Sequence, residues 1–323
     1  MTTPASSVTS QLDGPNLDAG LPVAIVSVLR PYYWAVRREL WEHRSLIIAP
    51  VVVSGLMVVA ILLNITHLHE LKPMIGTASH AQRWVVANFA LALPVLFVSM
   101  TMWVVAAFYA LDSLHSERRD RSILFWKSLP VSDTVTVLSK LSIPLIVTPI
   151  FTFVAALVSQ LTLVVAGALA LQASGVGALT YLRQLELVDL TMATVYMLAA
   201  SSLWYAPMYA WFMLVSVWSR RNALLWALLM PSALSVLERV AFHTTYLGSL
   251  IADRITGLAP AALRTSPQAM LTMEDLSKLD VHLVLSLLDP LGFVSDVHLW
   301  LGLVVAGVFS AATIWLRRHS DPI

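Results

Sequence analysis

The chain has 323 residues, of which 58% are hydrophobic and 12% are charged, with a net charge of +1 and no cysteine. Because a soluble domain carries about twice that charged fraction, this composition excludes a large soluble domain. The absence of cysteine excludes disulfides, thiolate metal sites, thiol nucleophiles and lipoprotein anchors.

The N-terminal residues 1–28 are rich in Ser, Thr, Pro and Gly, and they lack the basic start and short apolar stretch of a secretory signal. We expect them to form a retained, disordered cytoplasmic tail.

From Pro31 to about Arg44 the sequence predicts an amphipathic helix. The apolar residues that gather on one broad side of it are Tyr33, Trp34, Val36, Leu40 and Trp41. Glu39 and Glu42 point the other way, and Arg37 borders the apolar arc, where its side chain can snorkel. We expect this helix to lie in the inner membrane interface, with a cytoplasmic extension of the first span as the alternative.

Six long apolar runs follow, near 46–63, 84–111, 141–170, 188–217, 222–246 and 297–316. A helix rises about 1.5 Å per residue, so roughly 18 residues cross a hydrocarbon layer about 30 Å thick. The sequence therefore predicts an all-α, polytopic membrane protein with six transmembrane helices. Five of the six runs contain proline, which bends a helix by removing a backbone hydrogen bond.

The last run carries Gly302, Ala306 and Ser310 at four-residue spacing. Small residues at this spacing let two helices approach closely. Packing within the chain and dimerisation explain this stripe equally well.

Lysine and arginine set the orientation, because short cytoplasmic loops of membrane proteins carry the excess of these residues. With the N-terminus inside, thirteen of them face the cytoplasm and six face outward, while Arg239 lies within the fifth run. The inner set is Arg30, Arg37, Arg38, Arg44, Arg118, Arg119, Arg121, Lys127, Lys140, Arg220, Arg221, Arg317 and Arg318. We therefore expect both termini to be cytoplasmic.

Residues 112–140 form the one long inward loop, and its centre, Ile123 to Trp126, is strongly apolar. A loop in water does not expose four such side chains, so a partner or the membrane surface is expected to cover them. Ser132 and Asp133 are typical caps for a helix that runs into the third span.

The segment 247–296 between the fifth and sixth spans is expected to be external and partly helical. Within it, apolar residues recur at helical spacing from Pro267 to Asp289, which predicts one or two helices over the outer mouth.

Glu238 and Arg239 are the only adjacent charged pair inside an apolar run. Charged residues within a span usually face the protein interior and mark a pathway, but a pair near the outer leaflet can also be structural. The sequence leaves both possibilities open.

The chain has no G-x-x-x-x-G-K motif, which a chain that hydrolysed ATP would need to hold the phosphates, and no H-E-x-x-H metal motif. We expect it not to be an enzyme, and to have no catalytic residue, cofactor or metal of its own. Energy for any transport would come from another subunit or from an ion gradient.

Three blocks of the chain resemble the membrane subunits of ABC-2 type ATP-binding cassette transporters, particularly a proteobacterial permease group. They are RRELWEHRSLIIAP at 37–50, SERRDRSILFWKSLPVSD at 116–133 and LWLGLVVAGVFSAATIWLRR at 299–318. The middle block is the most specific of the three. The likeness extends over residues 30–318, which identifies 29–323 as the transmembrane domain, and nothing before Leu29 matches.

The resemblance implies a permease subunit of an exporter in the bacterial inner membrane. It implies a homodimer in membrane lipid that docks two copies of a separate ATPase, which binds ATP and Mg²⁺, and it implies no nucleic-acid partner. In that family the loop after the second span carries a coupling helix that sits in a groove of the ATPase. The loop residues that would make polar contacts with the ATPase are Glu117, Arg118, Arg119 and Asp120, and those that would pack between ATPase and spans are Phe125 and Trp126.

The alternative is a secondary transporter driven by an ion gradient. It predicts titratable residues near the bilayer midplane, where coupling ions bind, and the six runs offer almost none.

Overall fold

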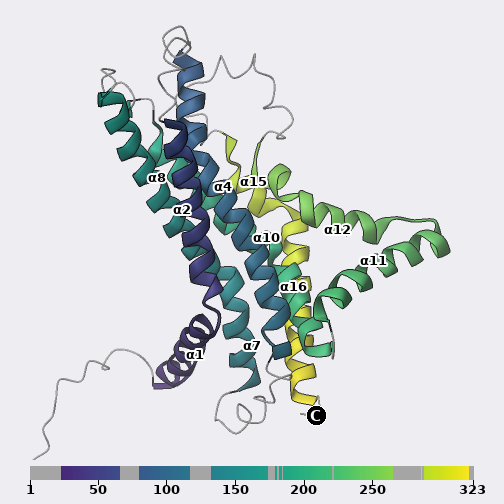
Figure 1. Ribbon diagram of the computed structural model, residues 1–323. Helices are drawn as coiled ribbons and strands as arrows, with labels where there is room; N and C mark the ends of the chain where they lie inside the picture. The colour runs from purple at the N-terminus through teal and green to yellow at the C-terminus, as the bar shows by residue number, and fades with distance from the viewer. Residues whose placement is uncertain are drawn as a thin grey trace, which may run out of the picture.

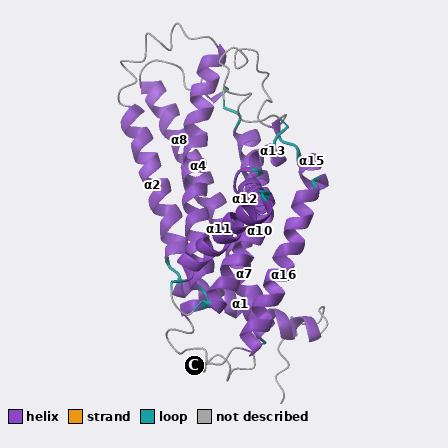
Figure 2. Cartoon of the chain, turned by 90° about the vertical axis from the view of Figure 1, so that its right-hand side faces the viewer, coloured by secondary structure: helices purple, strands orange, loops and turns teal. Residues whose placement is uncertain are grey.

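The computed structural model describes residues 23–65, 80–116, 132–173, 185–219, 222–264 and 287–319, together with Leu179, Leu182, Arg183 and Leu285. In these ranges the regular elements are all helices, and the only β pairing is an isolated bridge between Leu263 and Leu288. Six helices are long and apolar enough to cross a membrane. The predicted all-α polytopic fold is therefore confirmed, as the cartoon in Figure 2 shows.

The first helix, α1 (Val23–Glu42), begins before Pro31, the position at which the sequence analysis opens it, and runs on through that proline. After a short break come α2 (Ser45–Ile65) and α4 (His80–Asp112). Next, α7 (Asp133–Ser142), a π-helical turn (Ile143–Val147) and α8 (Thr148–Ala173) form one continuous rod. The chain continues through α10 (Leu187–Trp218), α11 (Ala223–Phe242), α12 (Tyr246–Thr256), α13 (Leu258–Ala262), α15 (Pro290–Ser295) and α16 (Val297–His319).

The rod formed by α7 and α8 starts as the sequence predicts, because Val135 N donates to the Ser132 hydroxyl at 3.3 Å and Asp133 lies in the first turn. Pro144 lies within the π-helical turn, where it has no N–H to donate. A π-helical turn inside a longer helix is a local widening of the backbone, often found at functional sites.

The spans pack as a bundle in which α10 lies between α16 and α4, while α2, α4 and α8 pack against one another (Figure 1). The small-residue stripe of α16 is used within the chain. Ala306 is buried against Ala206 and Ala210 of α10, where the absence of larger side chains lets the two helices come close.

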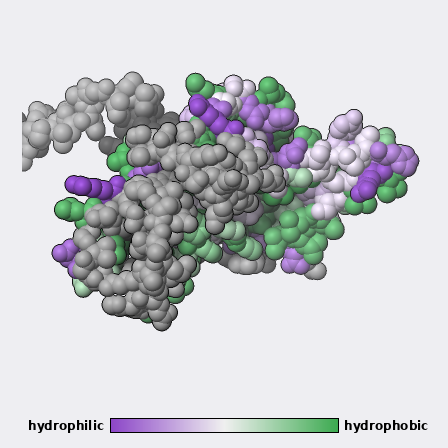
Figure 3. Space-filling model, turned by 90° about the horizontal axis from the view of Figure 1, so that it is seen from above, coloured by the Kyte–Doolittle hydropathy of each residue, from purple (hydrophilic) through white to green (hydrophobic). Residues whose placement is uncertain are grey.

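The fifth apolar helix leaves the bundle. In Figure 1 α11 slants away on one side and α12 returns toward the bundle, so that the two form a projecting hairpin. Seen from above in Figure 3, this side of the molecule projects well beyond the rest. Only Ala223 and Ala227 of α11 are buried, and Trp211 of α10 donates from Nε1 to the Ala227 carbonyl at 3.1 Å. The hairpin is therefore held to the bundle at its base and leaves a long apolar surface exposed.

Candidate functional site

A buried polar network lies where α1 meets the bundle. Glu39 of α1 is only 1% exposed, and its Oε1 accepts a hydrogen bond of 2.8 Å from the Lys140 ammonium of α7. Lys140 also donates to the Ser113 carbonyl, just past the end of α4, at 2.8 Å. Tyr109 of α4 donates its hydroxyl to Oε2 of Glu39 at 2.9 Å, and Arg38 donates to Oε1 at 2.9 Å. One carboxylate thus ties α1 to both α4 and α7.

Apolar side chains pack beside the buried centre of this network. Leu46, Tyr109 and Ile143 are buried around it, and Val36 and Leu40 of α1 pack against them. A charged pair in such surroundings loses its hydration, so it persists only because the two charges and their remaining hydrogen-bonding atoms are satisfied by one another and by the backbone.

The electrostatic balance keeps Glu39 ionised. Burial is the largest single influence on its pKa and acts to raise it, but the charge and hydrogen bond of Lys140, helped by Arg38 and Tyr109, outweigh burial. The pKa of Glu39 therefore lies below its ordinary value.

The sequence-based interpretation of α1 was wrong in placing Glu39 opposite Val36 and Leu40. Glu39, expected to point away from the apolar side, faces the bundle together with Val36 and Leu40, whereas Trp34 and Trp41 are 60% and 69% exposed. The outward aromatic side still suits a membrane surface, because the Arg37 guanidinium lies 5.1 Å from each of these two indole rings. Burial of Glu39 was not predictable from α1 alone, since Lys140 lies 101 positions further along the chain.

The end of α4 is fixed to α10 by a second set of contacts. The Ser216 hydroxyl accepts from the backbone N–H groups of Leu114 at 3.1 Å and His115 at 2.9 Å. The His115 ring lies 3.1 Å through Nδ1 from the Ser219 carbonyl. Ser216 is fully buried, so it supplies the acceptor that these backbone donors would otherwise lack.

The start of α7 is fixed to the C-terminal end of α16. Arg317 is 4% exposed and donates from Nε to Asp133 Oδ1 at 2.9 Å, and Arg318 donates to the Thr134 hydroxyl at 3.1 Å. Residues 117–131 lie outside the described part of the chain, but the residues on both sides of them are anchored to four helices, α1, α4, α10 and α16.

The loop residues proposed to contact an ATPase, Glu117, Arg118, Arg119, Asp120, Phe125 and Trp126, all lie within 117–131 and so outside the described residues. The helical pattern predicted from Pro267 to Asp289 lies mostly outside them too. The rest of the predicted external segment is partly helical, as α12, α13 and α15 show.

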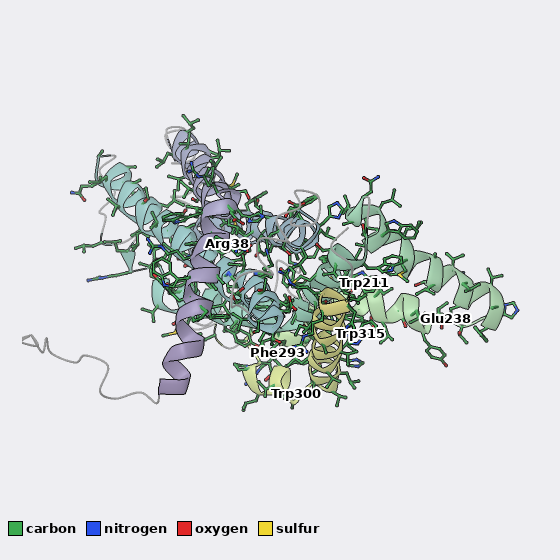
Figure 4. All side chains as sticks on the ribbon, turned by 90° about the horizontal axis from the view of Figure 1, so that it is seen from below. Arg38, Trp211, Glu238, Phe293, Trp300 and Trp315 are labelled. Atoms are coloured by element: carbon green, nitrogen blue, oxygen red, sulfur yellow. The ribbon has the colours of Figure 1, made fainter. Side chains whose placement is uncertain are left out.

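Glu238 lies far out on the projecting hairpin (Figure 4). Its carboxylate accepts hydrogen bonds of 2.8 Å from the Thr244 hydroxyl and from the backbone N–H groups of Tyr246 and Leu247. It therefore caps the first turn of α12 and closes the turn between α11 and α12. Arg239 beside it is exposed. This geometry gives Glu238 a structural role.

A second cluster, which sequence reasoning missed, holds the returning α12 against the bundle. The Arg254 guanidinium lies 4.6 Å from the centre of the Trp204 ring and donates to the His298 carbonyl at 3.0 Å, while Trp204 Nε1 donates to the Arg254 carbonyl at 2.9 Å. Gly302 of α16 leaves the space that this guanidinium fills. Burial lowers the pKa of Arg254, and Asp296 partly opposes that effect.

Among the described residues, ligand atoms of Glu39, Glu42 and His43 lie within 4.8 Å of one another, close enough for a metal ion. The Glu39 carboxylate already binds the ammonium of Lys140 and the guanidinium of Arg38. Two cationic side chains already contact one of the three ligands, and their charge opposes the binding of a metal cation there. This group is therefore better explained as part of the buried network.

The described residues thus form a helix bundle in which the residues on both sides of segment 117–131 are anchored by buried contacts. Comparison with models of protein families, with curated proteins and with solved structures finds no match to this chain.

Proposed function

We propose that this chain is the membrane-spanning permease subunit of an ATP-driven exporter whose ATPase is a separate protein. The observation that carries the proposal is the anchoring of both ends of segment 117–131. A loop that only connects two spans needs no buried ion pair at its base, whereas a loop that transmits force needs rigid attachment to the helices it moves.

The attachment joins helices that are distant in sequence. Lys140 binds Glu39 and the Ser113 carbonyl at once, so α1, α4 and α7 are held together as a unit at this end of the bundle. The π-helical turn follows directly after α7 and provides a place where this unit can tilt relative to α8. Displacement of the loop would then change the angles of the spans, which is how a transporter switches access.

The composition of segment 117–131 fits a protein partner. Its charged first part and its apolar centre, with Phe125 and Trp126, combine the polar rim and buried aromatic anchors of protein interfaces. We assign this contact to an ATPase that binds ATP and Mg²⁺, since the chain has no phosphate-binding loop of its own.

Topology and assembly follow from the same proposal. The start of α1, the start of α7 and the C-terminal end of α16 lie at one end of the bundle, which supports two termini on the cytoplasmic side of a bacterial inner membrane (Figure 1). The exposed apolar hairpin of α11 and α12 offers a surface for a second copy, giving a homodimer with two ATPase subunits.

The described charged residues disfavour the ion-gradient alternative. Those that are buried within the six spans are Lys140, Asp189 and Arg317, and each lies near the end of its span. Coupling ions in secondary transporters bind near the bilayer midplane, where the described spans bury no charged side chain.

The test is assembly of the chain with an ATPase encoded beside it, followed by ATP turnover in lipid. Phe125→Ala with Trp126→Ala removes two aromatic anchors, and we expect at least about tenfold weaker association and loss of ATPase stimulation. The matched control is Phe89→Ala with Trp300→Ala, which removes two exposed aromatic side chains elsewhere.

Wild-type assembly and turnover in the loop double mutant would overturn the proposal. Uptake driven by a proton or sodium gradient in vesicles without any ATPase would replace it with the secondary transporter.

A further inference from the structure

We propose that the cavity between α4 and α11, at the end of the bundle where α1 lies, binds an amphiphile with a protonated amine headgroup. Its volume is about 710 Å³, within the usual range for small-molecule sites. The lining residues come from four places in the chain: the break between α1 and α2, the second half of α4, the residues just after α4, and the start of α11.

The cavity is polar at its rim and apolar inside. Most of its polar lining residues lie at or just beyond the ends of apolar spans, and these are His43, Ser45, Asp112, His115 and Asn222. The remaining one is Tyr109, whose hydroxyl donates to Glu39.

The apolar lining residues lie deeper along the same helices. Phe108 precedes Asp112 by about one helical turn and Val105 by about two, and Leu224 and Leu225 begin the first turn of α11. A ligand that matches this change from polar to apolar lining has a polar head at the membrane surface and an apolar chain in the hydrocarbon.

The rim offers several hydrogen-bond acceptors, namely the Asp112 carboxylate and the side-chain oxygens of Ser45 and Asn222. His43 Nδ1 lies 3.3 Å from the Glu39 carbonyl, and His115 Nδ1 lies 3.1 Å from the Ser219 carbonyl. A carbonyl only accepts, so Nδ1 of each ring is the donor in this contact. The exposed carboxylate of Asp112 adds a negative charge, and no lysine or arginine is among the described lining residues.

A primary ammonium group matches this set of acceptors. It carries one positive charge and three donors, whereas an alcohol has one donor and no charge, and a sulfate or carboxylate head would be repelled by Asp112. The binding proposal stands without any ATPase. Its meaning as the class of exported substrate rests on the transport function proposed above.

The test uses the full chain in phosphatidylcholine nanodiscs and a long-chain alkylamine with a photoactivatable diazirine in its chain. We expect labelling on residues 105–112 and 222–225, located by peptide mass spectrometry. An otherwise identical probe with an alcohol headgroup partitions into the same lipid and should label these residues at least about tenfold less, because it forms no charge-assisted hydrogen bond.

Two variants probe the two parts of the cavity. Asp112→Asn removes the charge and should weaken competition by unlabelled dodecylamine about tenfold or more, and Leu225→Trp should block the chain site while leaving the rim intact. The matched control Asp253→Asn removes an exposed carboxylate that does not line the cavity, and it should label as the wild type does.

If phosphatidylethanolamine competes with the amine probe, the natural occupant is a membrane lipid. If it does not compete, the natural occupant is a non-lipid amine. Either result supports the amine site. Equal labelling by the alcohol probe, or unchanged competition in Asp112→Asn, would overturn the proposal. Because no ATPase is present, neither result bears on whether the loop docks one.

Discussion

Breaking the ion pair between Glu39 and Lys140 is the sharpest perturbation that the structure offers. Lys140→Met keeps the length and apolar stem of the side chain and removes the ammonium. Glu39 then stays buried without its nearest cation, and keeps the Tyr109 hydroxyl, the partly exposed Arg38 and the His43 ring at 3.8 Å as partners. This poorly compensated charge costs about 3 kcal/mol of folding free energy, the lower end of the range for breaking a buried ion pair.

Replacing both partners removes that uncompensated charge. In Glu39→Met with Lys140→Met, no buried charge remains at the centre of the network. The losses are the hydrogen bonds of Ser113 and Tyr109 and that of the partly exposed Arg38, which keeps Glu42 at 3.4 Å. The two buried bonds contribute about 1 kcal/mol each and the Arg38 bond less, so we expect the double variant to lie within about 2 kcal/mol of the wild type. With the single Glu39→Met variant, the set forms a double-mutant cycle that measures the coupling of the pair.

The measurement is equilibrium unfolding in mixed micelles with a denaturing detergent, followed by tryptophan fluorescence, for which the chain has 11 tryptophans. A cost below about 1 kcal/mol for Lys140→Met would refute the reasoning. The reasoning would also be refuted if the loss of unfolding free energy in the double variant equalled the sum of the losses in the two single variants. If the ion pair between Glu39 and Lys140 helps to transmit force from the loop to the spans, the double variant should be stable and yet transport more slowly.

Three further outcomes follow from the same structure. Gly302→Ala pushes aside the end of the Arg254 guanidinium and breaks its hydrogen bond to the His298 carbonyl, so it should lower the free energy of unfolding by about 1 kcal/mol, whereas Gly307→Ala meets open space and should not. Glu238→Gln weakens the cap of α12 and should speed amide hydrogen exchange at residues 243–247, an effect that Arg239→Gln should not share. The fold lowers the pKa of Glu39 from 4.5, so ionised Glu39 stabilises the folded state above that pH, and this stabilisation is lost as the pH falls below it. The wild type should therefore lose its stability advantage over Glu39→Gln in acid. A stability difference that does not change with pH would contradict this.

The sequence predicted the six spans and the cap at Ser132 because each depends on a local pattern. An apolar run of sufficient length is stable across a bilayer whatever it packs against, and a cap needs only the residues beside it. The same local reasoning established that no G-x-x-x-x-G-K motif occurs in the chain.

The tertiary structure alone decided which faces of the helices meet. Glu39 looked like a surface residue of an amphipathic helix until the fold brought Lys140 to it from the far end of the inward loop. Gly302 looked like a site of helix contact, and only the return of α12 showed that it accommodates the Arg254 side chain. Hydropathy sums over neighbouring residues and fixes which segments enter the membrane, whereas an ion pair or a close approach depends on the rotation and position of helices that the sequence keeps far apart.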